Sequence, residues 1–120
     1  MRSTKSAGDL GEEYALYLLK KSGYKILTTK FRSRFGEIDI IAQDKDILVF
    51  VEVKTRWSKN FGNPEDAVTS LKLRHLIKAA EYFKLMNPKT PGVMRFDVVA
   101  TDIRDGKVID ARILKNVTGF

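Results

Sequence analysis

The chain has 120 residues, of which 43% are hydrophobic and 31% charged, with a formal net charge of +7. This length suits one domain, expected to span residues 1–120 with a flexible N-terminus over residues 1–8, and the composition excludes a disordered or fibrous protein. The absence of cysteine excludes disulfides, zinc–thiolate sites and cysteine nucleophiles. No stretch resembles a signal peptide or a membrane span, so we expect a cytoplasmic protein without a membrane partner. The positive charge favours a polyanionic partner, nucleic acid above all.

The hydrophobic pattern predicts a helix over residues 9–22, followed by strands over 24–31, 35–43 and 47–55. A second helix starts either at Asn63, with a proline and two acids behind it, or at Thr69, and it ends before Pro88. Two last strands, 94–103 and 107–114, form a hairpin across an Asp-Gly turn. The order αβββαββ predicts an α/β fold with a mixed sheet of about five strands flanked by helices.

The strand over 47–55 carries unusual charges at its end. It is apolar from Ile47 to Val51, as in a central strand covered on both faces, and it continues into Glu52, Val53 and Lys54. With the two-residue period of a strand, Glu52 and Lys54 share a face and Val53 points the other way. A charge at the end of a buried strand needs a compensating partner.

The register of the neighbouring strand brings a second acid to the same place. If the tight turn pairs Gln43 with Leu48, Asp39 lies opposite Glu52, while Glu37 forms an ordinary ion pair with the lysine two residues beyond Glu52. Two opposed carboxylates repel and raise the pKa of one of them. A divalent cation removes this penalty, and hard oxygen ligands select Mg²⁺ or Mn²⁺. The alternative is a solvated ladder of opposite charges on an exposed strand.

Two segments carry a family resemblance. Residues 36–42 (GEIDIIA) and 49–56 (VFVEVKTR) closely resemble the signature of the YraN-like uncharacterised bacterial protein family. The match extends along the chain through Gly11, Glu12, Ala15, Phe61, Gly62, Pro64, Lys72, Arg95, Phe96 and Asp97. That family is similar to the restriction-endonuclease-like PD-(D/E)xK superfamily and to archaeal Holliday-junction resolvases. The resemblance implies a three-layer restriction-endonuclease-like fold and the chemistry of a metal-dependent nuclease.

The resemblance also implies a role for each site residue. Asp39 and Glu52 match the metal-binding acids, Lys54 matches the catalytic lysine, and Glu12 matches the acid that the first helix contributes. The alternative for Glu12 is a favourable charge in the first turn of a helix. The carbonyl of Val53 is placed to be a further metal ligand, since divalent cations accept irregular oxygen shells.

Basic and aromatic residues alternate on both sides of this candidate site. The residues expected to contact nucleic acid are Lys30, Arg32, Arg34, Arg56, Trp57, Lys59 and Lys72. Lys30, Arg32 and Arg34 alternate with other residues, so they would share one face of an extended segment. The alternative is a solvated basic face over core aromatics, which is favoured for Phe31 and Phe35. The single histidine, in the middle of the second helix, is expected at the surface.

Two classes of function remain open. The first is a Mg²⁺- or Mn²⁺-dependent nuclease that acts on structured or branched DNA. The second is a nuclease-fold module that binds nucleic acid or a protein without cutting. DNA is favoured over RNA as the partner, and a homodimer is expected only by analogy with enzymes that act on two-fold junctions.

Overall fold

The computed structural model describes residues 6–57 and 69–118. Its elements follow the predicted order αβββαββ. They are α1 (Ala7–Lys21), β1 (Lys25–Ser33), β2 (Gly36–Asp44), β3 (Ile47–Arg56), α2 (Ser70–Met86), β4 (Val93–Arg104) and β5 (Lys107–Leu114).

Side-chain caps set the start of both helices. The Ser6 hydroxyl accepts a hydrogen bond from the Asp9 backbone N–H, so α1 begins two residues earlier than predicted. Thr69 caps α2 through the Lys72 N–H, which confirms the later of the two predicted starts. The alternative start at Asn63 lies outside the described residues. None of the helices in the described part of the chain is long and apolar enough to cross a membrane.

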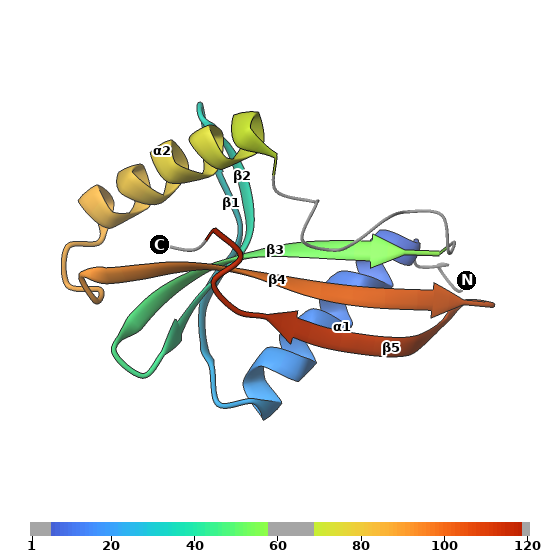
Figure 1. Ribbon diagram of the computed structural model, residues 1–120. Helices are drawn as coiled ribbons and strands as arrows, with labels where there is room; N and C mark the ends of the chain where they lie inside the picture. Colours follow the sequence, from blue (N-terminus) through green and yellow to red (C-terminus); the bar gives the residue numbers. More distant parts are fainter. Residues whose placement is uncertain (1–5, 58–68, 119–120) are drawn as a thin grey trace, which may run out of the picture.

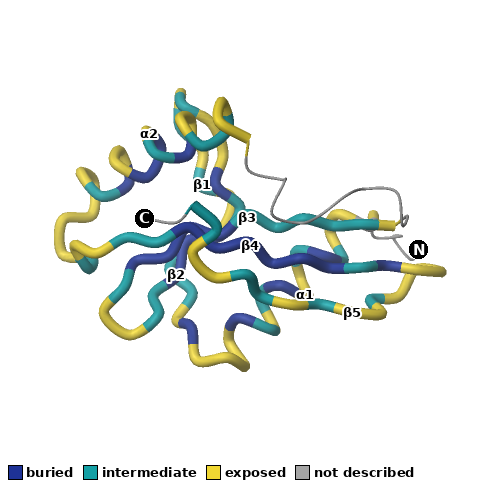
Figure 2. The backbone as a smooth tube through the Cα atoms, in the orientation of Figure 1, coloured by how far each residue is buried: buried dark blue, intermediate teal, exposed yellow. Residues whose placement is uncertain are grey.

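The sheet is mixed and lies between the two helices (Figure 1). Its strand order is β1-β2-β3-β4-β5, with β3 and β4 parallel and the other neighbours antiparallel. Residues from α1 pack with Val49 and Val51 on one face, and residues from α2 pack with Phe50 and Phe96 on the other. The buried residues are accordingly concentrated in the central strands (Figure 2). The predicted three-layer α/β architecture is therefore confirmed.

The β2–β3 ladder has the predicted register but ends early. It runs from the pair Asp44–Ile47 to the pair Ile40–Val51, with Gln43 opposite Leu48 as expected. Beyond this point the outer ends of β1 and β2 rise away from β3 towards α2 (Figure 1). The strands therefore part at Asp39, directly beside the end of the buried run in β3.

A backbone irregularity accompanies this departure. Ile40 packs in the core under α1, whereas Ile38 packs in the core under α2, so the strict alternation of faces is interrupted at Asp39. On the neighbouring strand Lys30 has a φ of 50°, in the left-handed region. As a consequence Glu37 never reaches β3, and the predicted ion pair between Glu37 and Lys54 is wrong. Glu37 instead pairs with Arg32 across the hairpin at 3.0 Å.

A buried polar network occupies the α1 side of β4. Asp97 is 1% exposed and accepts hydrogen bonds from the Tyr24 hydroxyl at 2.9 Å and from Arg95 Nε at 2.8 Å. The Asn116 backbone N–H also donates to Asp97, which ties the segment after β5 to the sheet. Arg95 donates to Asp44 as well and holds the pKa of that carboxyl below its usual range. The motif around residues 95–97 therefore has a structural role in this chain.

Candidate active site

A cleft of about 380 Å³ opens where β2 leaves β3. It receives residues from the start of α1, the break in β2, the end of β3 and the first turn of α2. All four residues predicted to be catalytic line it, and Val53 and Lys72 join them. The lining residues are Gly8, Asp9, Glu12, Asp39, Glu52, Val53, Lys54, Thr55 and Lys72.

Beyond Val51 the backbone of β3 is no longer paired with β2, and the side chain of Asp39 bonds to this edge of β3 instead. Its Oδ2 accepts a hydrogen bond from the Val53 backbone N–H at 2.8 Å. In a strand the N–H and C=O of one residue point to the same side, so the Val53 carbonyl also faces the open edge that Asp39 covers. The Val53 side chain packs on the core under α1, as predicted. The backbone of Val53 thus meets the cleft while its side chain belongs to the core.

Asp39 and Glu52 influence each other directly. Burial raises the pKa of both carboxyl groups, and the charge of Asp39 raises the pKa of Glu52 further. The two groups are close enough to share a hydrogen bond when one of them is protonated. The predicted juxtaposition of the two acids is therefore present, although the ladder itself ends one residue before Asp39.

Lys72 is the positive partner of this acid pair. Its ammonium group donates to Glu52 Oε1 from the first turn of α2, and the Glu52 side chain is only 14% exposed. Sequence reasoning assigned Lys72 to nucleic-acid contact, and its position in the motif was the only signal. The structure brings it to the acids, so the cleft is lined by two lysines, Lys54 from β3 and Lys72 from α2.

Glu12 approaches the same cleft from α1. Burial raises the pKa of Glu12, the nearby charge of Lys30 lowers it, and Asp39 raises it again. Lys30 lines a small pocket together with Glu12 and Thr29. Lys30 therefore lies on the α1 side of the molecule, whereas Arg32 and Arg34 line a separate pocket against α2. The prediction that these three cations share one face is wrong, because the backbone of β1 is irregular at Lys30.

The remaining basic residues that were predicted to contact nucleic acid have different surroundings. Arg56 forms a bidentate ion pair with Asp102 on the neighbouring strand, at 2.8 and 3.1 Å. Arg34 stacks over the ring of Phe35, with the guanidinium carbon 4.9 Å from the centroid. Lys59 lies outside the described residues. Arg34 is thus better placed than Arg56 to meet a phosphate, because Asp102 already compensates the charge of Arg56.

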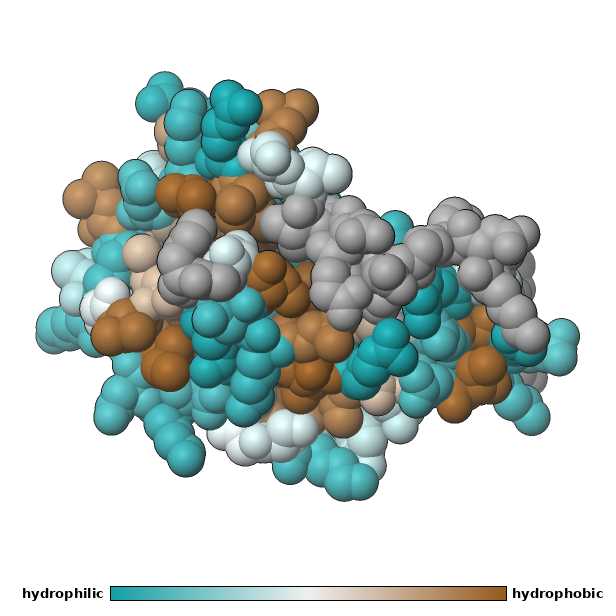
Figure 3. All heavy atoms as spheres, viewed as in Figure 1, coloured by the Kyte–Doolittle hydropathy of each residue, from teal (hydrophilic) through white to brown (hydrophobic). Residues whose placement is uncertain are grey.

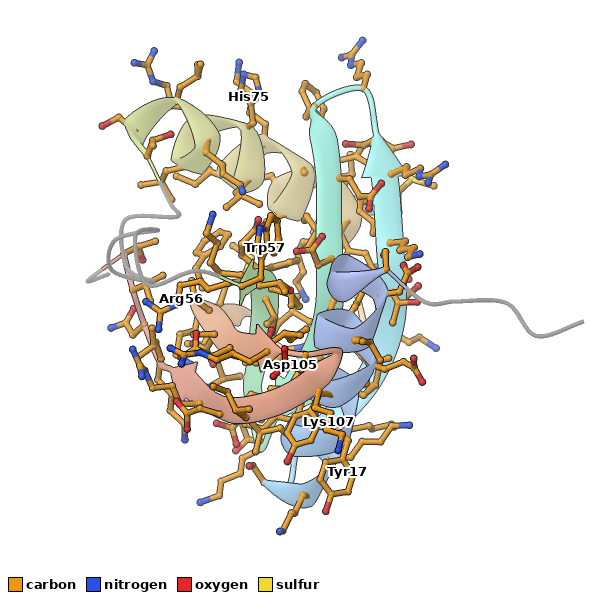
Figure 4. All side chains as sticks on the ribbon, turned by 90° about the vertical axis from the view of Figure 1, so that its right-hand side faces the viewer. Tyr17, Arg56, Trp57, His75, Asp105 and Lys107 are labelled. Atoms are coloured by element: carbon orange, nitrogen blue, oxygen red, sulfur yellow. The ribbon has the colours of Figure 1, made fainter. Side chains whose placement is uncertain are left out.

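Trp57 ends the run that starts at Glu52. It is 60% exposed and lies on the side of the molecule that faces the viewer in Figure 4, below α2. His75 is exposed on the outer surface of α2 (Figure 4), as predicted. Trp57 therefore follows the cleft-lining residues Lys54 and Thr55 in the chain with a largely exposed side chain, whereas His75 points away from the cleft.

The donors of the cleft suit a hard divalent cation. In the described part of the chain no three acidic or histidine side chains converge on one point. Of the four acids that line the cleft, Asp39 and Glu52 are the neighbouring pair, and the backbone of Val53 lies beside them. Mg²⁺ is commonly held by one or two carboxylates, and water and substrate phosphates complete its shell. A cation here would also relieve the repulsion that raises the pKa of Glu52.

A family model described as "Uncharacterised protein family UPF0102" matches residues 11–101 of this chain. The chain belongs to the UPF0102 family. This confirms the resemblance drawn from the two sequence segments. The first and last residues of the UPF0102 match, Gly11 and Thr101, lie close together in the fold. A Cβ atom added to Gly11 would lie 2.7 Å from Thr101 Oγ1.

Curated UPF0102 relatives match over most of their own length. A "UPF0102 protein" of Caldicellulosiruptor saccharolyticus is 46% identical over 110 residues, which cover 91% of this chain and 93% of the relative. A UPF0102 protein of Caldicellulosiruptor bescii is 49% identical over 104 residues, with 86% and 87% covered. One from Syntrophomonas wolfei is 47% identical over 97 residues, with 81% and 84% covered.

Proposed function

We propose that this chain is a metal-dependent nuclease that hydrolyses phosphodiester bonds in DNA. The observation that carries the proposal is the meeting of two buried carboxyl groups with raised pKa values, Asp39 and Glu52, with Lys54 and Lys72 in one cleft. Acids with raised pKa values beside lysines, at the end of a buried strand, are typical of catalytic sites. The net charge of +7 supports a polyanionic substrate.

The residues of the cleft have complementary tasks in such a reaction. Asp39, Glu52 and the Val53 carbonyl would hold a Mg²⁺ or Mn²⁺ ion, which when bound supplies positive charge to the phosphate and makes a water molecule more acidic. The ammonium group of Lys54 orients the attacking water or stabilises the charge that develops on the phosphate oxygens. Lys72 keeps the Glu52 carboxylate in place.

Glu12 is the residue of the cleft best suited to exchange a proton. Its raised pKa brings it nearer to the pH at which a carboxyl group is both a usable acid and a usable base. Structured or branched DNA is the preferred substrate in this proposal, by the resemblance to junction resolvases. The same analogy suggests a homodimer.

One observation favours the second candidate, a module that binds without cutting. Lys72 already neutralises Glu52, so the acid pair does not depend on a metal ion to be tolerated. In that case Lys54 and Lys72 serve as charge partners of the buried acids. Substitution of either lysine should then mainly reduce stability.

A cleavage assay separates the two candidates. Linear, nicked, flapped and four-way DNA are incubated with the purified protein in Mg²⁺, in Mn²⁺ and in EDTA. Lys54→Ala and Glu52→Gln should each reduce cleavage by about 100-fold or more, since they act on charge formed in the transition state. The double variant should be barely worse than either single variant, as expected for groups that work as a unit.

Lys107→Ala is the matched control, because Lys107 lies exposed at the start of β5 (Figure 4). It should cut like the wild type, and Lys54→Ala should keep the wild-type affinity for DNA. Cleavage by Lys54→Ala at the level of the wild type and of Lys107→Ala would indicate a contaminating nuclease and refute the proposal. So would a wild-type protein that binds metal and branched DNA but cuts none of the substrates.

A further inference from the structure

A second and larger pocket lies between the tip of the β1–β2 hairpin and α2. Its volume is about 780 Å³, within the range of pockets that take small organic ligands. Arg32, Arg34 and Phe35 line it from the hairpin, and Lys78, Tyr82 and Leu85 line it from α2. The α2 residues recur at spacings of three and four, so they form one face of the helix.

The floor of this pocket is aromatic. Tyr82 is 40% exposed, and its ring lies 6.4 Å from that of Phe35 and 6.2 Å from that of Phe31. Phe31 in turn packs edge-on against Phe83 in the core at 5.3 Å, so it supports the floor from below. The predicted core role of Phe31 is therefore confirmed, while Tyr82 presents an aromatic surface to solvent.

The rim of the pocket is basic. Arg34 lies over the ring of Phe35, and Lys78 adds a second cation from α2. Glu81 is the acid among the lining residues, and the Arg32 charge is shared with Glu37. Figure 3 shows hydrophobic side chains over α2 among hydrophilic ones, so apolar and charged surfaces alternate along this helix. An aromatic floor under a cationic rim suits a flat, apolar ring attached to an anionic backbone.

We propose that this pocket binds an unpaired base of single-stranded DNA, with Tyr82 as the stacking surface and Arg34 and Lys78 on the adjacent phosphates. Single-stranded binders combine these two elements, because every base has a face that stacks and every link carries a charge. In a duplex the faces of the bases are stacked on one another, so duplex DNA would contact the basic rim of the pocket but not its aromatic floor. The pocket therefore selects DNA with a single-stranded portion over intact duplex.

The position of the pocket relates this selection to the proposed nuclease site. Glu37, which pairs with Arg32, lies two residues from Asp39 on the same strand, a distance of about 7 Å. The pocket and the cleft thus share two elements, the β1–β2 hairpin and α2. The inference relies on the proposed function in taking DNA as the ligand, but it concerns binding alone.

The test measures binding in EDTA, where no metal-dependent cleavage occurs. Fluorescence anisotropy reports the affinity for a single-stranded oligonucleotide and for a duplex of the same length, and a 2-aminopurine in the single strand reports stacking. Tyr82→Ala should weaken single-strand binding by about tenfold and abolish the 2-aminopurine signal, with duplex binding unchanged. Tyr82→Phe keeps the ring and should bind as the wild type does.

Tyr17→Ala is the matched control, since Tyr17 is 53% exposed on α1, at the opposite end of the molecule from α2 in Figure 4. It should leave both affinities unchanged. Lys78→Ala removes no core contact and should lower the salt dependence of single-strand binding by about 0.7 in log–log slope. A folded Tyr82→Ala protein with wild-type single-strand affinity would overturn the inference, as would a wild type that prefers duplex.

The outcomes also separate this inference from the nuclease proposal. Tyr82-dependent single-strand binding by a protein that cuts no DNA would support the pocket and refute the nuclease. Metal-dependent cleavage, together with a single-strand affinity that Tyr82→Ala leaves unchanged, would support the nuclease and refute the pocket.

Discussion

The repulsion between Asp39 and Glu52 can be removed by one conservative substitution. Asp39 Oδ2 accepts a hydrogen bond from the Val53 N–H at 2.8 Å, and an asparagine keeps a carbonyl oxygen that can accept the same bond. Asp39→Asn therefore deletes the charge with little change in packing. We expect the metal-free protein to become more stable at neutral pH and to lose its response to divalent metal.

The magnitude follows from Coulomb's law for two neighbouring carboxylates, whose charge centres are taken to be about 5 Å apart. At an effective dielectric constant of about 20 they repel by about 3 kcal/mol. Lys72 offsets part of this through its ion pair with Glu52, and a neutral acceptor for Val53 is weaker by about 1 kcal/mol. The net gain is on the order of 1 kcal/mol, or about 3–6 °C in Tm for a domain of this size.

The gain should depend on pH in one direction. Because the pKa of Asp39 is raised in the folded protein, the native state holds this proton more tightly than the unfolded state does. The free energy of unfolding of the wild type therefore falls as the pH rises from the ordinary pKa of a carboxyl group to the raised pKa of Asp39 in the folded protein. Above the raised pKa, the wild type is least stable relative to the variant. Asp39→Asn should flatten this decline.

Thermal unfolding followed by circular dichroism, in EDTA and in millimolar Mg²⁺ or Mn²⁺, measures each part of this prediction. At a metal concentration ten times Kd the wild type should gain about 1.4 kcal/mol, and Asp39→Asn should gain nothing. Asp110→Asn, at an exposed acid of β5 that lies 3.5 Å from Arg112, is the control and should behave as the wild type. A lower Tm of Asp39→Asn in EDTA, with Asp110→Asn unchanged, would refute the repulsion. A wild-type Tm indifferent to metal would refute the metal site.

Three further predictions concern the fold and its partner. Gly11→Ala should destabilise the protein by about 1–3 kcal/mol in urea unfolding, since its Cβ would lie 2.7 Å from Thr101 Oγ1; Gly8→Ala, with 3.8 Å to its nearest neighbour, should not, and equal effects would contradict this account. Tyr24→Phe removes a donor to the buried Asp97 and should cost about 1.5–3 kcal/mol by the same measurement. A smaller loss than about 0.5 kcal/mol would show that the other donors suffice. Metal-free DNA binding should weaken with salt at a log–log slope of about −0.9 per phosphate contacted, and salt-independent binding would remove the electrostatic account.

The sequence by itself determined the elements and the core of the site, because these depend on local rules. The apolar run before Glu52 marks β3 as a central strand, and its two-residue period separates Val53 from its charged neighbours. The tight turn after Gln43 is enough to set the register that leads to Asp39. Thr69 has the side chain of a helix cap, so the start of α2 could be read as one of two alternatives.

Only the tertiary structure decided which charges meet. The hairpin leaves β3 at Asp39 because its outer half packs on α2, and no local pattern shows that the ladder stops there. This departure separates Glu37 from Lys54 and opens the cleft that Lys72 enters from a helix twenty residues further along the chain. Long charged side chains pair with whichever opposite charge lies nearby in space. Which charges lie nearby depends on the residue at which two paired strands separate, and packing against other elements sets that residue.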